Sequence, residues 1–174
     1  MSLFLNLTDK QRNSPIYRII KPDRLFELFD KREGVLVHPS RWEDPYENFI
    51  LRSKVRGSDG KTRQYDYHKN FYGQCWTLNK ASDAMWRIYS HDHQGIRIKT
   101  TVQKLIMGLY NGGVYRPDMF CVIGKVDYLT EQKLLKFANG IYYNGKISKE
   151  NLFRSLLVKR KALQCKSKFN SSFT

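Results

Sequence analysis

The 174-residue chain has few cysteines, and their number and spacing exclude a disulfide framework. The three cysteines, Cys75, Cys121 and Cys165, lie far apart, whereas disulfide-stabilised domains carry an even number at close, regular spacing. Two of them occur in apolar runs, where a free cysteine usually behaves as a small buried hydrophobic residue. We therefore expect reduced thiols and a cytoplasmic protein.

Long apolar runs are also missing. No stretch approaches the roughly 18 apolar residues that span a bilayer, and residues 1–7 lack the basic lead and the cleavage site of a signal peptide. We expect no membrane partner. The length suits one domain, with residues 1–15 loosely held, residues 16–163 forming the domain and residues 164–174 forming a basic polar tail.

Several catalytic signatures are absent from the sequence. It has no glycine-rich phosphate-binding loop and no nucleophile elbow around a serine. His91 and His93 are neighbours, but no third ligand follows at a recognised spacing, so we expect no metal site and a polar turn there. Cys75 has no activating partner nearby in sequence, so we expect it in the core.

Acidic residues are scarce. The chain has 16 Asp and Glu against 31 Lys and Arg, a net charge of +15, and none of the acids follows Glu150. A charge of this size attracts polyanions. The alternative interpretation is a basic surface that is simply solvated.

Periodicity predicts helices and strands in mixed order. Residues 16–20 and 96–100 alternate as strands, and Pro22 begins a helix that ends at Gly34. Residues 71–78 predict a core strand. The expected buried face of the first helix contains Leu25, Phe26, Leu28 and Phe29.

The second half of the chain follows the same mixed order. Ser82, Thr130 and Ser148 are expected helix caps, and the last helix is expected to run towards Leu163. Since strands and helices alternate without a regular βαβ order, we predict an α+β fold with several short helices. Its sheet is expected to be curved and mixed or antiparallel.

An ordered set of motifs along residues 16–163 resembles an uncharacterised bacterial family found in phage-defence contexts. That family has a Tyr-Lys/Arg-Tyr strand, a Phe-Asn-Asp-Pro-Phe-Glu loop, a Cys-Phe-Ser strand, a Met-Trp-x-x-Tyr helix and a Lys/His-Gly-Val/Ile strand. The matching segments here are Tyr17-Arg18-Ile19, Trp42-Glu43-Asp44-Pro45-Tyr46-Glu47, Cys75-Trp76-Thr77, Met85-Trp86-Arg87-Ile88-Tyr89 and Gln94-Gly95-Ile96. Two later features match at Lys125-Val126-Asp127-Tyr128 and Lys159-Arg160-Lys161-Ala162.

The chain departs from the family at one late motif. Where members have a Glu-x-Glu-x-Arg strand, this sequence places Lys166 and Lys168 in the two carboxylate positions. Members usually continue further, so the resemblance implies a degenerate or truncated C-terminal part.

The family's layout is similar to that of ADP-ribosyltransferases, which transfer the ADP-ribose group of NAD. The similarity implies that Arg18 holds a phosphate of NAD through a bidentate fork, that Thr77 lies on the middle strand, and that Trp86 and Tyr89 form the pocket wall. Without the late carboxylates, which would stabilise the developing sugar cation, we expect a weak or inactive transferase acting on protein or nucleic acid. Glu47 is the one candidate catalytic residue.

Each of these residues has a simpler interpretation. Arg18 on a strand edge can serve as a surface ion-pair partner, and Trp86 can belong to the core, because large aromatics bury well anywhere. Asp44 can cap the helix that follows its loop, and Glu47 flanks the same loop.

A second hypothesis is a non-enzymatic module that binds RNA or DNA. Basic residues next to aromatics suit a single strand, through phosphate contacts and base stacking. Two clusters are candidates, with Tyr65, Tyr67, Phe71 and Tyr72 following the first. They contain Arg52, Lys54, Arg56, Lys61 and Arg63, and then Lys159, Arg160 and Lys161. The alternative is a solvated face above core aromatics.

Overall fold

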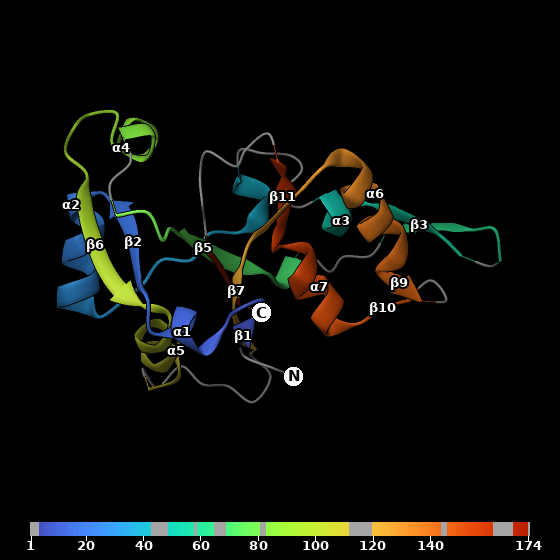
Figure 1. Cartoon of the computed structure of the whole chain (residues 1–174), viewed down its shortest axis with the longest axis horizontal. Helices are drawn as coiled ribbons and strands as arrows, with labels where there is room; N and C mark the ends of the chain where they lie inside the picture. Colours follow the sequence, from blue (N-terminus) through green and yellow to red (C-terminus); the bar gives the residue numbers. More distant parts are fainter. Residues whose placement is uncertain are drawn as a thin grey trace.

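The computed structural model describes residues 4–42, 49–57, 59–64, 69–80, 83–111, 120–143, 146–161 and 169–173. These residues form one α+β domain, as the sequence predicts. Short helices and small sheets follow one another along the long axis of the molecule (Figure 1). Pairing is both parallel and antiparallel, so the sheet structure is mixed.

The largest sheet has the strand order β1-β7-β12-β5. Its strands are β1 (Phe4–Leu5), β5 (Tyr72–Trp76), β7 (Cys121–Lys125) and β12 (Phe169–Phe173). β12 lies between β5 and β7 and is antiparallel to both. The expectation of a polar tail outside the domain is therefore wrong for residues 169–173, because their backbone completes this sheet from both sides.

The core lies on the two faces of this sheet. Val122 belongs to a cluster with Phe71 and Phe153, whereas its neighbour Ile123 belongs to a second cluster with Ile16 and Trp76. Successive residues of a strand point to opposite faces, so β7 separates the two clusters. Phe71 and Phe153 meet edge to face with ring centroids 5.3 Å apart, a favoured aromatic geometry.

A second sheet consists of β2 (Pro15–Ile20) and β6 (Ile96–Thr101), two antiparallel strands that pair Arg18 with Ile98. Beyond this pair, Tyr17 N donates to Thr77 O at 2.8 Å and Thr77 N donates to Tyr17 O at 2.9 Å. This two-way bridge joins β2 to the residue that follows β5. It brings β2 beside the segment that follows β5.

Three smaller pairs complete the strands. They are β3 (Lys54–Arg56) with β4 (Thr62–Gln64), β8 (Asp127–Leu129) with β11 (Val158–Arg160), and β9 (Tyr142–Tyr143) with β10 (Lys146–Ile147). The β8–β11 pair is parallel and the other two are antiparallel. β3 and β4 therefore form a β-hairpin.

The helices are short, as the sequence predicts. They are α1 (Asp9–Arg12), α2 (Pro22–Phe26), α3 (Phe49–Arg52), α4 (Asp83–Tyr89), α5 (Val102–Asn111), α6 (Glu131–Gly140) and α7 (Lys149–Ser155), with a 3-10 turn η2 (Pro39–Arg41). Pro22 begins α2, and the hydroxyls of Thr130 and Ser148 accept from the backbone N–H of Lys133 and Asn151. These three predictions are confirmed. The expected cap Ser82 lies outside the described residues.

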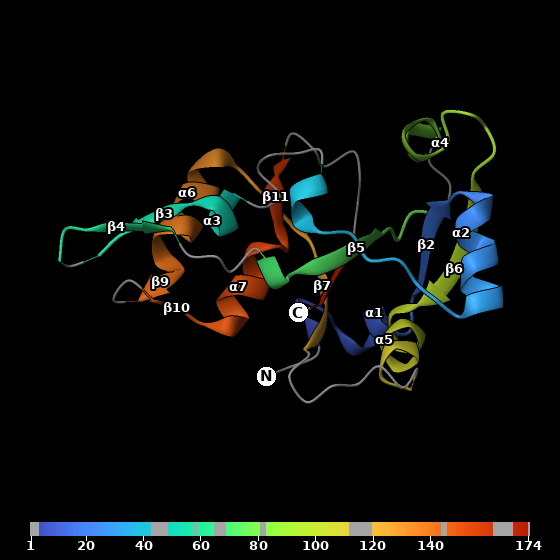
Figure 2. The ribbon, with the colours of Figure 1, turned by 180° about the vertical axis from the view of Figure 1, so that it is seen from behind.

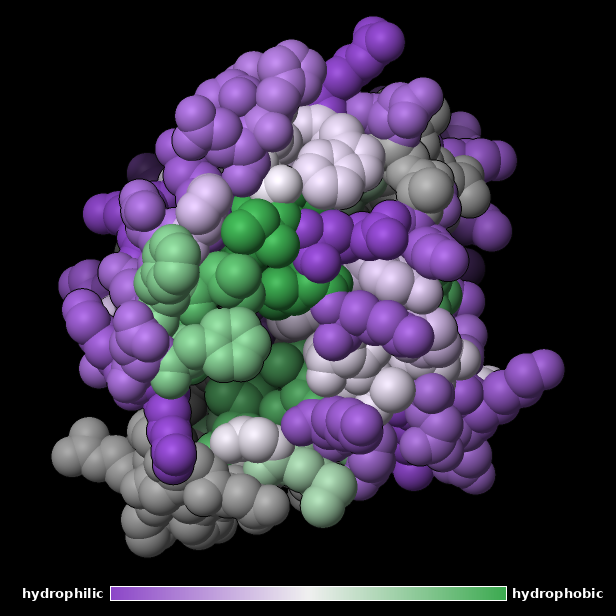
Figure 3. Space-filling view, turned by 90° about the vertical axis from the view of Figure 1, so that its left-hand side faces the viewer, coloured by the Kyte–Doolittle hydropathy of each residue, from purple (hydrophilic) through white to green (hydrophobic). Residues whose placement is uncertain are grey.

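The expected buried face of the first helix is wrong. Phe26 is 62% exposed and Phe29 is 72% exposed. After α2 the helix continues as a π-helical turn, η1 (Glu27–Lys31), and Arg32 ends it in the left-handed conformation at φ 56°. The wider π turn changes which side chains share a face, so a pattern counted at 3.6 residues per turn no longer holds. Apolar side chains gather on this end of the molecule (Figure 3).

The last helix is also shorter than expected. It stops at Ser155, and residues 158–160 form strand β11 beside β8. Leu156 and Leu157 lie in the turn between these elements and are fully buried. Burial on all sides gives the same apolar run as a helix face, which explains the error.

Within the described ranges, the structure has no helix that is both long enough and apolar enough to cross a membrane.

Candidate functional site

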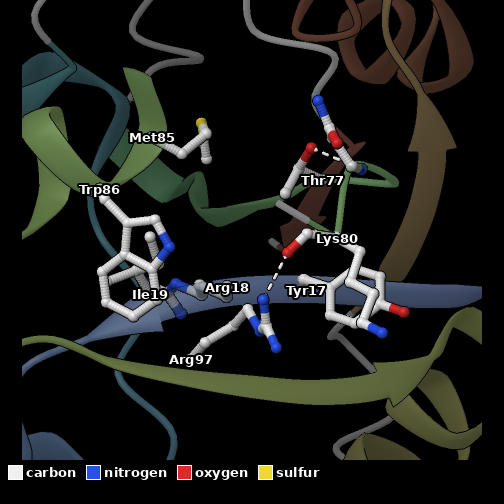
Figure 4. A pocket seen from close by; sticks show the side chains of 9 residues that line it. Tyr17, Arg18, Ile19, Thr77, Lys80, Met85, Trp86 and Arg97 are labelled. Carbon is white, nitrogen blue, oxygen red and sulfur yellow. Dashed lines mark hydrogen bonds between the residues drawn. The ribbon is translucent and has the colours of Figure 1, made fainter. Parts of the chain in front are cut away.

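A recess opens between β2, β6, α4 and the segment that follows β5 (Figure 4). It is lined by Tyr17, Arg18, Ile19, Thr77, Asn79, Lys80, Met85, Trp86 and Arg97. The hollow measures about 230 Å³ with its open mouth included, and its cavity volume of about 10 Å³ holds roughly one water molecule. The recess is therefore an open depression in the surface.

Arg18 enters the recess from β2. Its Nη1 donates to Oε1 of Gln74, a residue of β5 that lies 56 positions away in sequence. Burial lowers the pKa of the Arg18 guanidinium, and the nearby Cys75 thiol and Tyr89 phenol oppose that shift. No carboxylate pairs with Arg18 in the described part of the chain. The guanidinium is thus partly removed from water with a neutral amide as its acceptor.

Thr77 shapes the wall opposite. It is 4% exposed, it makes the two-way bridge to Tyr17, and its Oγ1 accepts from the backbone N–H of Asn79 at 3.1 Å. This hydrogen bond turns the chain immediately after β5. The turn carries Lys80 to the rim of the recess.

Two further cations stand at the rim. Arg97 on β6 donates from Nη1 to the carbonyl oxygen of Lys80 at 2.6 Å (Figure 4), and its guanidinium carbon lies 5.7 Å from the centroid of the Tyr17 ring. The side chains of Lys80 and Arg97 are exposed, and neither forms an ion pair among the described residues. Together with Arg18 they give the lining three positive charges, and no acidic residue of the described ranges lines it.

Helix α4 supplies the aromatic wall. The indole of Trp86 extends from the helix towards β2 and lies beside Ile19 (Figure 4). The turn after α4 is tightly packed, because Gly95 N donates to Ser90 Oγ at 2.8 Å and Gly95 has no room for a side chain. This packing fixes the helix that presents Trp86 relative to β6.

The predicted cofactor residues come together only in part. Arg18, Thr77 and Trp86 all line the recess, although they are distant in sequence. Tyr89 is not part of the lining, but its phenol is close enough to influence the Arg18 guanidinium, and it is 36% exposed. Glu47 lies outside the described residues. The prediction that these side chains act on NAD stays a prediction.

Sequence reasoning missed Lys80 and Arg97. Arg97 had a signal, since it occupies a polar position of the alternating strand at residues 96–100, but alternation shows only that a side chain faces away from the core. Lys80 follows the core strand with no motif of its own. Lys80 becomes part of the site through the bridge between Tyr17 and Thr77, and Arg97 through the pairing of β6 with β2. No local pattern indicates either connection.

The β3–β4 hairpin forms a second candidate site, at the end of the molecule opposite the recess (Figures 1 and 2). Arg52, Lys54, Arg56, Lys61 and Arg63 are all exposed on it or beside it. Arg63 is neutralised by Asp59, with Nη2 and Oδ2 2.5 Å apart. The other four have no carboxylate partner among the described residues, so their charge faces the solvent.

The C-terminal basic cluster is divided by the fold. Lys159 is 1% exposed, and its Nζ lies 5.7 Å from the centroid of the Trp42 ring, a cation–π contact. Arg160 is partly buried, and Lys161 is exposed. Lys159 is therefore out of reach of an external polyanion in this conformation.

The described residues contain no group of three or more His, Cys, Asp or Glu side chains that could hold a metal ion. His91 and His93 lie exposed in the turn after α4, where His93 adopts the left-handed conformation at φ 56°. They occupy the polar turn that the sequence predicts.

Comparison with known proteins gives no match: no family model, no curated protein and no solved structure matches this chain. The resemblance to a bacterial defence-associated family therefore rests on the ordered motifs alone. The likeness to ADP-ribosyltransferases stays a prediction from the same motifs.

Proposed function

We propose that the protein is a non-enzymatic module that binds nucleic acid. The observation that carries the proposal is the β3–β4 hairpin with the adjoining end of α3. Arg52, Lys54, Arg56 and Lys61 are exposed cations there without a carboxylate partner among the described residues. Lys54 and Arg56 point to the same face, because they are two positions apart on one strand. Phosphates that bind such a row of cations release counterions, which is the main source of affinity for a nucleic-acid backbone.

The net charge of +15 supports the same function. It attracts a long polyanion from a distance and speeds encounter at low ionic strength. The cations are also distributed, because the hairpin and the recess occupy opposite ends of the molecule (Figure 2). A polymer can contact both ends at once, whereas a small anion can contact one.

The experiment is fluorescence anisotropy with single-stranded RNA and DNA oligonucleotides over a series of salt concentrations. We expect binding that weakens steeply with salt. The triple variant K54Q/R56Q/K61Q should lose about tenfold or more in affinity and flatten the salt slope by about one unit per lost phosphate contact. The control K10Q/K31Q/K133Q removes three exposed cations from scattered helical positions.

The control should change affinity much less than the hairpin variant does. Equal losses in the two variants would show that general charge, rather than the hairpin, binds the strand. No binding at low salt, or binding that salt does not weaken, would refute the proposed function.

A second candidate is an ADP-ribosyltransferase-like function in a bacterial defence or toxin protein. It is favoured by one observation: Arg18, Thr77 and Trp86 line the same recess. The cavity volume of about 10 Å³ is far below the roughly 300 Å³ of ordinary ligand pockets. Among the residues that the structure describes, no carboxylate lines the recess to stabilise a sugar cation. Labelled NAD with cell extract tests this candidate, since no label transfer and no thermal shift would discard it.

A further inference from the structure

Arg18 carries a positive charge that the described part of the protein does not neutralise. A guanidinium has five N–H donors, and the hydrogen bond from Arg18 goes to the neutral amide of Gln74. A charge that is withdrawn from water without a counter-charge costs free energy, which is why buried cations are usually paired with an anion. An external anion would supply that pairing.

The surroundings of Arg18 favour an anion from outside. Lys80 and Arg97 line the same recess, and all nine lining residues are either cationic or uncharged. Three cations at one opening repel one another. A bound anion attracts all three, and this attraction offsets their mutual repulsion. A phosphate group suits the site, because its oxygens accept two parallel hydrogen bonds from a guanidinium fork.

The aromatic wall adds a second requirement on the ligand. Trp86 presents its indole beside Ile19 at the same opening (Figure 4), and Tyr89, one turn further along α4, is 36% exposed. Bases of a single strand stack on exposed aromatic side chains. Because the enclosed volume holds roughly one water molecule, the ring must lie at the mouth rather than inside.

We propose that the recess binds one unpaired nucleotide, with its phosphate on Arg18, Lys80 and Arg97 and its base against Trp86. The inference rests on the proposed nucleic-acid function and names the part of the strand that this end of the protein recognises. A dinucleotide such as NAD offers the same phosphate and ring chemistry. A competition experiment distinguishes a nucleotide of a strand from a free dinucleotide.

The test is an NMR titration of the full chain with 5′-AMP as the probe and adenosine as the phosphate-free control. We expect 5′-AMP, but not adenosine, to shift the Arg18 Nε–H and Trp86 indole N–H signals. R97Q and K80Q should each weaken 5′-AMP binding by about fivefold or more, and W86A should weaken it to a similar extent. R87Q is the matched control, because Arg87 is an exposed cation on α4 that does not line the recess.

Arg18 itself is tested by R18Q and R18K. R18K keeps the charge but loses the bidentate fork, so it should bind 5′-AMP better than R18Q and worse than the wild type. Both variants are checked by their far-UV and near-UV circular dichroism. If they fail to fold, R97Q, K80Q and R87Q still decide the inference.

The outcomes separate this inference from the proposed function. Oligonucleotide binding without any 5′-AMP shift at Arg18 and Trp86 overturns the inference and leaves the hairpin function standing. Binding of 5′-AMP without oligonucleotide binding overturns the function and leaves the recess as a nucleotide site. Equal shifts with adenosine, or equal losses in R97Q and R87Q, overturn the inference.

Competition then identifies the source of the nucleotide. An oligonucleotide that displaces 5′-AMP from the recess supports a strand as the ligand. If NAD binds more than tenfold tighter than 5′-AMP and an oligonucleotide does not displace it, the ligand is a dinucleotide. That result overturns the proposal that the recess binds a nucleotide of a strand.

Discussion

Gly95 lies between α4 and β6, where the chain has no space for a side chain. A Cβ at this position would lie 2.7 Å from Ser90 Cβ and 2.8 Å from Ile19 Cγ2, well inside the 3.5–4.0 Å of ordinary carbon contacts. Gly95→Ala should therefore destabilise the protein by about 1–3 kcal/mol. Urea unfolding measures the change in the free energy of unfolding.

Gly108, within α5, provides the matched comparison. A Cβ there would meet nothing within 4 Å, and alanine is favoured over glycine in a helix by about 1 kcal/mol. Gly108→Ala should therefore stabilise the protein. If both substitutions stabilise, the packing of Ser90 and Ile19 around Gly95 is looser than described.

Asp59 offsets part of the positive charge of the β3–β4 hairpin through its ion pair with Arg63. The side-chain hydrogen bond from Arg63 lowers the pKa of the Asp59 carboxyl from 3.8 to about 2, with help from the backbone N–H of Lys61. Since the folded pKa is depressed, the stabilisation from this carboxylate is present above about pH 4 and is lost as the pH falls towards 2. An NMR titration of the Asp59 carboxyl carbon should show a midpoint near 2.

R63Q tests the cause of that shift. Removing the guanidinium should move the midpoint back towards 3.8. K61Q should leave the midpoint low, because the Lys61 backbone N–H is unchanged by the substitution. A midpoint near 3.8 in the wild type would contradict the ion pair.

At the scale of elements, the π-helical turn η1 leaves Phe29 outside the core, although the sequence predicts this residue on a buried helix face. Phe29 is 72% exposed, whereas Phe153 on α7 is 2% exposed and packs edge to face on Phe71. Phe153→Ala should cost about 3–5 kcal/mol of stability, and Phe29→Ala should stay within about 0.5 kcal/mol of the wild type. A large loss of stability in Phe29→Ala would show that Phe29 packs on a buried helix face, as the sequence predicts.

The elements differ in how far the sequence predicts them. Pro22, Thr130 and Ser148 act within one turn of their own helices, so local patterns suffice to find them. The end of the first helix depends on a π turn and on Arg32 in the left-handed conformation, for which the sequence offers Gly34 as a false signal. Local chemistry predicts where elements begin better than where they end.

At the scale of the whole molecule, the position of β12 controls the main sheet. It pairs with β5 on one side and β7 on the other, so a proline there removes a backbone donor from an interior strand. Ser171→Pro should destabilise the protein by about 3 kcal/mol or more. Thermal unfolding followed by circular dichroism measures the effect.

Ser171→Ala is the control, since it keeps the backbone donor. It should cost much less than Ser171→Pro. Equal stability of the two variants would contradict the placement of residues 169–173 inside the sheet. It would support the prediction that these residues form a polar tail outside the domain.

The candidate site is also a property of the whole molecule. The sequence predicts Arg18, Thr77 and Trp86 as neighbours through a resemblance between families, and all three line the recess. It does not predict Lys80 or Arg97. Lys80 reaches the recess through the bridge between Tyr17 and Thr77, and Arg97 reaches it through the pairing of β6 with β2, and both connections join residues far apart in the chain. Contacts of that range leave no periodic trace in the sequence.

The place of β12 has a consequence for biosynthesis. β5 and β7 are synthesised well before residues 169–173, so the edges of β5 and β7 that face β12 stay unpaired until those residues arrive. Open edges of this kind recruit other chains during folding, and pairings between distant segments form slowly. We therefore expect the protein to be most prone to aggregation before residues 169–173 have joined the sheet.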